Sequence, residues 1–581
     1  MANAAMMARQ FRYLLAGAAL ASGVGLASVA QEPPAAAPAA IEEQLIGEIA
    51  PGTDLETLSA VLSPDGQRLA WRAKRNRKWT MTVNGEPGPE FDEVGAPRFS
   101  ADSRRLAYAG KRGRSWLAVV DGKEGPPFEE LSWPEFSADS QHVFYRAKRN
   151  KKWLAVVGGK EGPEFEEIRF LRLSADGQRV VYTGRRAKQW TLVVNGEPGP
   201  TYEEVRFLVL TPDGQHLAYA AKRNKKWLMV VDGKEGPECD DIDSPVLYSP
   251  DGQRLAYAAK RLKKWLMVVD GKEGSPADMV EALAFSADSR RYAYFSGSEA
   301  KGWKADWKST IVVDGQEGPP FPGRGWIDEE SSLASFLTSK IIKLTEFEEQ
   351  GVILREYSYT LGSGLTQEHH HKYLRLAAST TGVSLPALSP DGHHVAYAAR
   401  PEKNSAVVMQ DGQAGPAFEG ILTIPVFSPD SQRLAYVAWE KDKIIEVING
   451  ERKAEFAAEK GKNYVLNITF SPDGQRFAYV LVLQGTVATG RARRRVAVDG
   501  KAGKEYNALA VVDLKFSPDS RHLAYLVRDP GDNKWVVVLD AQEGKLYDAI
   551  LEGTLSFSEE NEGTYVAQVG NRYYRVKHKA P

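Results

Sequence analysis

The sequence predicts an all-β protein made of four-stranded antiparallel units that form the blades of β-propellers. A Ser-Pro-Asp-Gly-like turn recurs, and an Asn-Gly or Asp-Gly pair, the strongest short hairpin signal, follows in most repeats. The repeats have no helical periodicity, and a period of about 40 residues without helices indicates blades. The aspartates of the recurring turn are Asp65, Asp102, Asp139, Asp176, Asp213, Asp251 and Asp288, 37 or 38 residues apart, and then Asp391, Asp430, Asp473 and Asp519.

Residues 206–243 illustrate one repeat. Phe207–Thr211 is expected as a short first strand, and the tight turn around Asp213 ends it. His216–Ala221 alternates like a second strand. Trp227–Val231 is a β-branched and aromatic third strand, followed by the hairpin pair Asp232-Gly233. A short fourth segment, Pro237–Ile242, completes the unit.

The composition excludes several classes of protein. The chain has 581 residues, with 75 Lys and Arg against 76 Asp and Glu, and a formal net charge of −1. These values exclude a disordered acidic chain, a polytopic membrane protein and a broadly basic nucleic-acid binder. A single cysteine, Cys239, excludes a disulfide framework and a thiolate metal cluster.

The N-terminal segment is typical of export. Residues 1–30 read as a signal peptide, with Arg9 and Arg12 before an apolar stretch and the small residues Ser28-Val29-Ala30 at a cleavage position. A membrane anchor is the alternative, although the apolar run is shorter than the ~20 residues that span a bilayer. Residues 31–40, rich in Pro and Ala, are expected to form a stiff tether. The mature chain, after about Ala30, is therefore predicted to be periplasmic or secreted.

The stretch Ser249–Tyr257, and nearly so Ser63–Trp71, resembles the repeat of TolB-type, WD-repeat-like β-propellers. This resemblance covers most of residues 55–578 and implies a propeller fold. The chain lacks the α/β domain that precedes the propeller in TolB, and it has no Gly-x-Ser-x-Gly pentapeptide of the prolyl-oligopeptidase-type propellers. For function, the resemblance implies a binding scaffold, by analogy of fold alone.

The repeats predict two tandem propellers of about seven and about six blades, because single rings usually have four to eight. The first covers residues 41–327 with seven regular blades, residues 328–381 are a degenerate blade or an insert with strands at Leu344–Tyr359 and Tyr373–Ala377, and the second covers residues 382–581. The alternative is one large ring of about twelve blades. The terminal unit, Thr554–Lys577, lacks its outer strand, and Gln44–Ala50 is expected to supply it, since closure removes exposed edges.

Several repeated side chains have two interpretations. The tryptophans that start the third strands and the tyrosines of the second strands either pack blade against blade or offer stacking platforms to sugars. The turn aspartates either cap their own turns or bind calcium, which needs six to eight clustered oxygens. Cys239 stands where other repeats have Phe or Tyr, so we expect a buried core residue and not a reactive thiol.

Basic turns between the second and third strands are the main candidate for a binding surface. The links between blades, on the same face, are acidic, and the count of 22 bases against 16 acids leaves about +6 on this face. Two interpretations remain: a solvated rim of paired charges, or a basic rim that attracts an anionic partner. The candidate residues are Lys74, Arg75, Lys78, Arg112, Arg114, Arg149, Lys152, Arg186, Lys188, Arg223, Lys226, Arg261 and Lys264.

The predicted function is that of a non-enzymatic exported scaffold that binds a protein or an anionic envelope component, with peripheral membrane contact possible in principle and no nucleic acid. No catalytic residue and no cofactor is predicted, since the chain has no nucleophile elbow and no phosphate loop. His369 and His371 are weak candidates for a zinc site, because alternate residues of a strand share one face. The alternative is an enzyme or a carbohydrate-binding propeller with its site at the central channel.

Overall fold

The computed structural model describes residues 40–49, 60–299, 307–322, 341–349, 352–360, 366–369, 382–384, 386–402, 405–457, 464–485, 492–508, 510–528, 533–551 and 553–580. All of them belong to one compact unit, Ala39–Ala580. Every element of these residues is a β-strand. No helix in the described ranges is long and apolar enough to cross a membrane. The predicted signal peptide and most of the tether lie outside the described residues.

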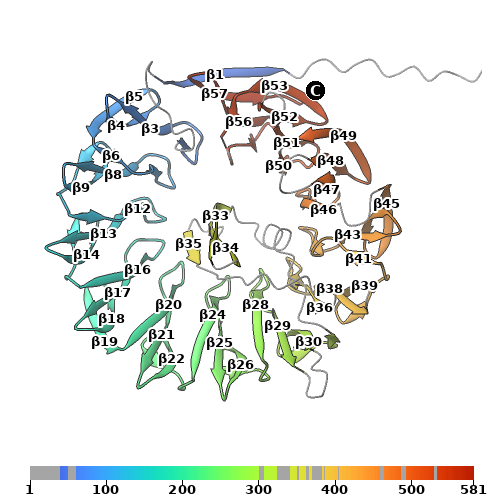
Figure 1. Cartoon of the computed structure of the whole chain (residues 1–581), viewed down its shortest axis with the longest axis horizontal. Coiled ribbons are helices and arrows are strands. Elements are labelled where there is room, and N and C mark those ends of the chain that lie inside the picture. The colour runs from blue at the N-terminus through green and yellow to red at the C-terminus, as the bar shows by residue number, and fades with distance from the viewer. Residues whose placement is uncertain are drawn as a thin grey trace, which may run out of the picture. The chain divides into compact units, whose positions relative to one another are not determined.

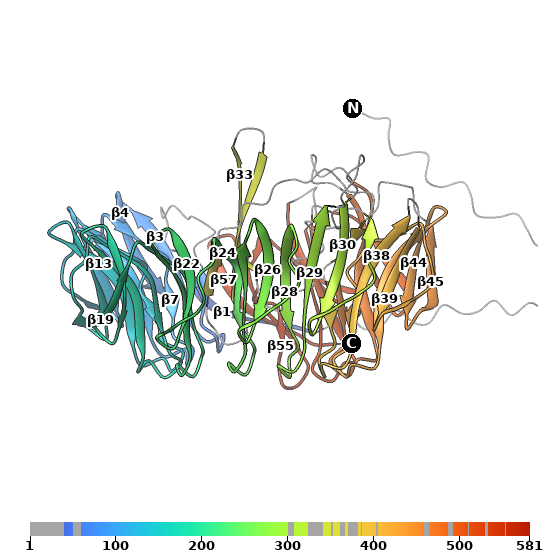
Figure 2. The same cartoon turned by 90° about the horizontal axis from the view of Figure 1, so that it is seen from below.

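The described strands form thirteen sheets, and twelve of these are blades of a ring (Figure 1). Neighbouring strands of each blade are antiparallel, so successive turns lie alternately on the two faces of the ring (Figure 2). Blade 1 contains β2 (Val61–Leu62), β3 (Leu69–Arg75), β4 (Lys78–Val83) and β5 (Glu86–Phe91). Blade 2 contains β6 (Glu93–Val94), β7 (Arg98–Phe99), β8 (Leu106–Arg112), β9 (Ser115–Val120) and β10 (Lys123–Glu124). Blade 3 contains β11 (Glu130–Leu131), β12 (Glu135–Phe136), β13 (Val143–Arg149), β14 (Lys152–Val157) and β15 (Lys160–Glu161).

The next four blades complete the regular series. Blade 4 contains β16 (Glu167–Leu173), β17 (Val180–Arg186), β18 (Gln189–Val194) and β19 (Glu197–Tyr202). Blade 5 contains β20 (Glu204–Leu210), β21 (Leu217–Arg223), β22 (Lys226–Val231) and β23 (Lys234–Glu235). Blade 6 contains β24 (Asp241–Tyr248), β25 (Leu255–Arg261), β26 (Lys264–Val269) and β27 (Lys272–Glu273). Blade 7 contains β28 (Met279–Phe285), β29 (Tyr292–Glu299), β30 (Trp307–Val313), β31 (Gln316–Glu317) and β32 (Phe321–Pro322).

Five blades follow an intervening sheet. Blade 8 contains β36 (Gly382–Val383), β37 (Ala387–Leu388), β38 (Val395–Glu402), β39 (Ser405–Gln410) and β40 (Gln413–Ala414). Blade 9 contains β41 (Gly420–Ile421), β42 (Val426–Phe427), β43 (Leu434–Glu440), β44 (Lys443–Ile448) and β45 (Glu451–Ala457). Blade 10 contains β46 (Tyr464–Phe470), β47 (Phe477–Gly485), β48 (Ala492–Val498) and β49 (Lys501–Ala508). Blade 11 contains β50 (Ala510–Phe516), β51 (Leu523–Arg528), β52 (Trp535–Leu539) and β53 (Gln542–Tyr547). Blade 12 contains β54 (Ala549–Ile550), β55 (Ser556–Phe557), β56 (Gly563–Val569), β57 (Arg572–His578) and, from the N-terminus, β1 (Ile41–Glu48).

The segment between blades 7 and 8 holds a separate three-stranded sheet. Its strands β33 (Ile341–Glu349), β34 (Val352–Thr360) and β35 (Thr366–His369) pair with one another and with no other strand that the structure describes. The expected strand at Leu344–Tyr359 is in fact the hairpin of β33 and β34. The expected strand at Tyr373–Ala377 lies outside the described residues.

The N-terminal strand closes the ring, as the missing outer strand of the last repeat predicts. β1 pairs antiparallel with β57 from Ile41 opposite His578 to Glu48 opposite Arg572. The Glu43 carboxylate reinforces this closure, because it accepts hydrogen bonds from Lys545 Nζ at 2.8 Å and from the Tyr547 hydroxyl at 2.9 Å. Both ends of the chain therefore contribute strands to a single blade.

Two junctions show one ring of twelve blades, so the prediction of two tandem propellers is wrong and its stated alternative is right. Blade 7 packs on blade 8 through a cluster that includes Phe295, Val383 and Tyr397. Blade 1 packs on blade 12 through Trp71 and Tyr573, whose ring centroids are 5.7 Å apart. The physical reason is the wedge angle between neighbouring blades, about 30° in a twelve-bladed ring against about 50° in a seven-bladed one. Most junctions use similar aromatic and aliphatic residues, so the repeat pattern does not reveal this angle.

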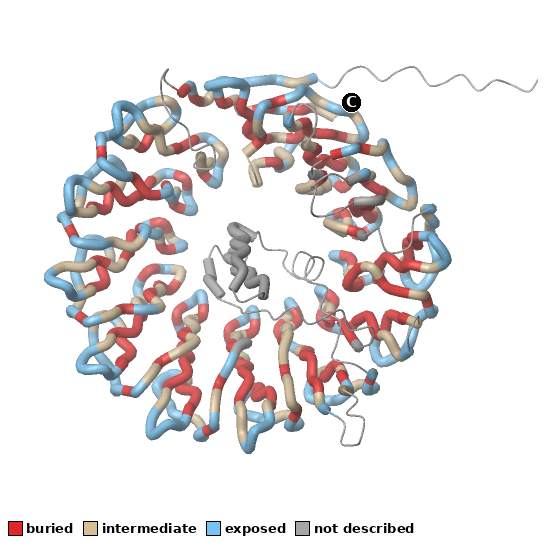
Figure 3. Tube along the Cα trace, viewed as in Figure 1, coloured by how far each residue is buried: buried red, intermediate tan, exposed pale blue. Residues whose placement is uncertain are grey.

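Buried aromatic and aliphatic side chains fill the space between blades. The residues of the inner and middle strands are mostly buried, whereas the outer edge of the ring is exposed (Figure 3). The Tyr108 ring of blade 2 meets Phe91 of blade 1 edge to face at 6.3 Å, and the same contact joins Phe165 and Tyr182. These contacts confirm that the second-strand tyrosines pack blade against blade, as large aromatic rings at buried sheet interfaces do.

An arginine at the start of the second strand also links neighbouring blades. Arg105 Nη1 donates to the Gln141 carbonyl of the next blade at 2.7 Å, and Arg254 Nη1 donates to the Arg290 carbonyl at 2.7 Å. At the ring closure, Arg575 donates to the Gly66 carbonyl. These hydrogen bonds fix one blade to the turn of the next on the face opposite to the basic turns.

Candidate functional site

The candidate surface consists of the turns between the second and third strands of blades 1–6, which we call the crown turns. Each is a two-residue hairpin connection, and in five blades both central residues have positive φ, as a type I′ turn requires. In blade 2 only Gly113, the first central residue, has positive φ, which fits a type II′ turn. The crown turns are residues 74–78, 111–115, 148–152, 185–189, 222–226 and 260–264.

The first cation of each crown turn lies on a tryptophan of its own blade. Lys74 Nζ is 5.2 Å from the centroid of the Trp79 ring, and the corresponding distance in blade 6, from Lys260 to Trp265, is 5.1 Å. The same pairing occurs between Lys111 and Trp116, Lys148 and Trp153, Arg185 and Trp190, and Lys222 and Trp227. Cation–π contact therefore accounts for both the first cation and the repeated tryptophan.

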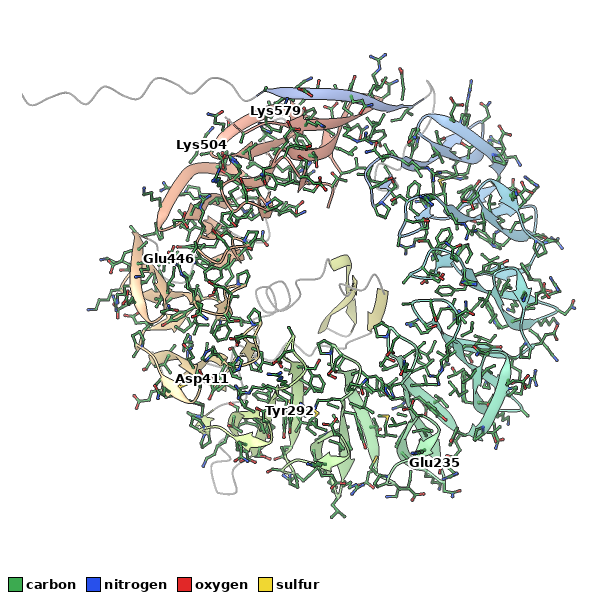
Figure 4. The ribbon with its side chains drawn as sticks, turned by 180° about the vertical axis from the view of Figure 1, so that it is seen from behind. Glu235, Tyr292, Asp411, Glu446, Lys504 and Lys579 are labelled. Atoms are coloured by element: carbon green, nitrogen blue, oxygen red, sulfur yellow. The ribbon has the colours of Figure 1, made fainter. Side chains whose placement is uncertain are left out.

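The second cation is an arginine that is mostly neutralised. Arg112, Arg149, Arg223 and Arg261 form ion pairs with Glu124, Glu161, Glu235 and Glu273 of the outer strands. Figure 4 shows Glu235 on the outer rim of the ring. Arg186 instead donates to the Glu164 carbonyl at 2.8 Å and lies over the Phe165 ring. Arg75 forms no ion pair within the described residues.

The acids of the links between blades neutralise a further set of lysines. Lys78, Lys226 and Lys264 pair with Asp92, Asp240 and Asp278 at 2.6, 2.6 and 2.5 Å. Asp92 also accepts a hydrogen bond from the Gly113 amide of the next crown turn at 2.7 Å. The hydrogen bond from Lys78 lowers the pKa of the Asp92 carboxyl.

The second of the two central residues in each crown turn is a cation whose side chain has no partner within the described ranges. We call Arg77, Arg114, Lys151, Lys188, Lys225 and Lys263 the apex cations. All six are exposed, and their side chains form no hydrogen bond, ion pair or ring contact with any residue that the structure describes. Six consecutive blades thus each present one free positive charge on the same face.

Of the thirteen residues of the predicted basic rim, Arg114 and Lys188 are apex cations. Arg75 and Lys152 also have no side-chain partner among the described residues, whereas the other nine contact residues of the ring. The position within the hairpin identifies the other apex cations. The third and fourth residues of each five-residue crown segment form the two-residue turn, and the apex cation is the fourth.

The backbone of the apex cations adds a second observation. Lys151, Lys188 and Lys263 have φ of 62°, 67° and 67°, a left-handed conformation that costs an ordinary residue about 1–2 kcal/mol. At the opposite face, the hairpins between third and fourth strands place glycine at the same turn position, such as Gly122 and Gly233, both at φ 78°. The crown turns thus carry a cation where the chain elsewhere uses glycine.

Two other sets of sequence candidates have structural roles. The turn aspartates cap their own turns: Asp251 accepts from the Ser249 hydroxyl at 2.5 Å and from the Gln253 amide at 3.0 Å. The Ser249 hydrogen bond and the amide together lower the pKa of Asp251. Cys239 is buried, and desolvation raises the pKa of its thiol to about 11, as expected of a core residue.

The histidine candidates do not form a describable site. His369 ends β35, but its side chain, like the whole of His371, lies outside the described residues. Among the residues that the structure does describe, no group of three or more His, Cys, Asp or Glu side chains is placed to hold a metal ion.

Comparisons with known proteins give no family. No protein-family description matches the chain, and no curated protein does. Among solved structures, a chain described as "Crystal structure of the eukaryotic initiation factor" aligns with 67% of this chain and 95% of its own, at 12% identity and a TM-score of 0.29. A chain of the Kuenenia stuttgartiensis hydrazine synthase aligns over 54% of this chain and 94% of its own, at 10% identity and a TM-score of 0.21.

Proposed function

We propose that this protein is an exported, non-enzymatic scaffold that binds an anionic partner, an acidic protein or an anionic envelope component, through the apex cations. The single observation that carries the proposal is the row of six free cations on consecutive blades. Export to the periplasm or the medium is part of the proposal and rests on the N-terminal sequence. So is the TolB-like character, which rests on the repeat motif.

Charge and geometry support this proposal together. Most other crown cations lie on an aromatic ring or form an ion pair within the ring of blades, whereas the apex cations have no partner among the described residues. A rigid ring holds them in one arc, and several weak contacts to one polyanion then act as a single multivalent contact. The left-handed backbone at five of the six positions costs stability, and the cationic side chains make no contact with the described residues in return.

Matched lysine variants test the proposal. In the apex variant, Lys151, Lys188, Lys225 and Lys263 are replaced by Gln. In the control variant, Lys123, Lys160, Lys234 and Lys272 are replaced by Gln. The control lysines are exposed in the hairpins of the opposite face, so both variants lose the same charge.

The readout is retention on sulfate-bearing beads over a range of salt concentrations. We expect the apex variant to elute at much lower salt, while the control variant elutes near the unmodified protein. Equal elution of both variants at low salt would overturn the proposal, because net charge and not the crown would then determine retention.

A second candidate, carbohydrate binding at the inner strands, is favoured by one observation. Trp133 in the innermost part of blade 3 is 48% exposed, whereas the other tryptophans whose burial the structure describes are buried or half-buried. It lies at 6.4 Å from the Trp116 ring, edge to face. A Trp133→Ala variant that loses retention on a neutral polysaccharide resin would favour this candidate, and unchanged retention would exclude it.

A further inference from the structure

The crown turn of blade 6 has a bulky apolar residue at its first central position. Leu262 occupies the first central position, where the other crown turns have Asn76, Gly113, Asn150, Ala187 and Asn224. Its side chain is 91% exposed, the most exposed large apolar side chain among the described residues. Its φ is 48°, so a bulky residue stands in the left-handed conformation.

The fold holds this leucine in place. Its neighbours Arg261 and Lys264 are tied to Glu273 and Asp278. Asp240 of the preceding link accepts hydrogen bonds from the amides of Leu262 and Lys263 and pairs with Lys226 at 2.6 Å. The turn is thus anchored by the neighbouring blade, and its tip presents one apolar side chain next to one free cation.

Two unfavourable features therefore meet at Leu262, an apolar side chain in water and a left-handed backbone, and no packing contact covers the side chain within the described residues. An exposed leucine beside free cations matches the chemistry of an anionic lipid surface, in which headgroup phosphates attract the cations and the acyl boundary receives the apolar group. An acidic protein or a soluble polyanion would use the apex cations but would leave Leu262 in water.

We propose that the anionic partner is a lipid bilayer, on which the apex cations contact headgroup phosphates while Leu262 enters the interface. This inference rests on the proposed function and narrows it to one partner. The row of six cations along one face fits a flat, multiply charged surface, since every apex can then find a phosphate at the same time.

Vesicles of phosphatidylcholine with phosphatidylglycerol provide the test, and vesicles of phosphatidylcholine alone provide the reference. The first variant is Leu262→Asn, which restores the residue of three other crown turns and leaves every charge in place. The control is Leu546→Thr, which removes a 49% exposed leucine from the outer strand β53. We expect vesicle partitioning to weaken about ten-fold for Leu262→Asn and to stay unchanged for Leu546→Thr.

A labelled variant reports insertion directly. Leu262→Cys, carrying an environment-sensitive dye, is expected to show a blue-shifted emission with phosphatidylglycerol vesicles and none with phosphatidylcholine alone. Cys239 is buried and stays unlabelled. An unshifted emission together with unchanged partitioning of Leu262→Asn would overturn the inference.

Retention on sulfate-bearing beads distinguishes a failure of the lipid inference from a failure of the proposed binding to an anionic partner. If Leu262→Asn binds the beads normally and partitions onto vesicles as well as the unmodified protein does, the anionic-partner function stands and the lipid inference falls. If the apex variant also keeps its bead and vesicle binding, both fall.

Discussion

The guanidinium of Arg291 donates a hydrogen bond to the backbone carbonyl of His393 at 2.6 Å, although 102 positions separate the two residues in the sequence. The same arginine pairs with Asp314 of its own blade at 2.7 Å. In blades 1, 2, 4, 6, 9 and 10 the arginine at this position likewise donates to a carbonyl in the turn of the next repeat. Blade 8 therefore follows blade 7 directly in the ring, although a long segment separates them in the sequence.

This hydrogen bond predicts a stability effect. We expect Arg291→Met to lower the free energy of unfolding by about 1 kcal/mol, because it removes a charge-assisted bond across the blade 7–blade 8 junction. The neighbouring variant Arg290→Met serves as control, since the Arg290 side chain is 79% exposed and contacts only Asp288, at 3.7 Å. Denaturant titration measures both, and equal effects would contradict the role of Arg291 as a junction residue.

Replacing apex cations by glycine is expected to stabilise the fold while it removes the charges that we propose bind the partner. Replacing Lys151, Lys188 and Lys263 by Gly should raise the free energy of unfolding by about 0.5–1 kcal/mol per turn, because glycine adopts the left-handed conformation without strain. Replacing Arg114, whose φ is not positive, should not stabilise the protein. Thermal unfolding checks the difference; destabilisation by all four changes would argue against stored strain at the apex.

Cys239 is expected to be unreactive in the native protein. Burial raises the pKa of its thiol to about 11, so almost no thiolate is present at neutral pH. A colourless disulfide reagent that releases a coloured thiolate should react with Cys239 only after unfolding, whereas it should modify the Leu262→Cys variant at once. Rapid modification of the unaltered chain would show that blade 5 opens under native conditions.

The seam of the ring predicts a pH dependence. His578 is fully buried, neither ring nitrogen has a hydrogen-bond partner within the described residues, and desolvation lowers its pKa. In the unfolded chain the His578 imidazole binds a proton near pH 6.5, whereas in the folded chain it stays neutral until a lower pH. The free energy of unfolding therefore falls as the pH drops below about 6.5.

Melting temperatures at pH 7.5 and pH 5.5 measure this effect. The difference should shrink in His578→Phe and persist in His393→Gln, because the His393 side chain is 68% exposed. An undiminished difference in His578→Phe would assign the pH dependence to another group.

The sequence alone was sufficient to predict the strands and turns of a single blade and the location of the basic turns. Each repeat specifies its turns and strands through local chemistry: the capping aspartate, the Asp-Gly hairpin and the alternating second strand act within a few residues. In blade 5, the expected third strand Trp227–Val231 agrees with β22 to within one residue. The missing outer strand of the last repeat also indicated where β1 would pair, because an unpaired edge requires a partner.

Only the tertiary structure decided the number of blades in the ring and which charges remain free. The wedge between two blades depends on how whole side chains such as Phe295 and Tyr397 fill the junction, and small differences in this angle add up around the ring. Likewise, Lys78 and Arg77 look equivalent in the sequence, but the turn directs one toward Asp92 and leaves the other in solvent. Interactions between residues close in the sequence fix the structure of one blade. Ring closure and ion pairing depend on contacts between residues that are distant in the sequence, which the repeat pattern does not identify.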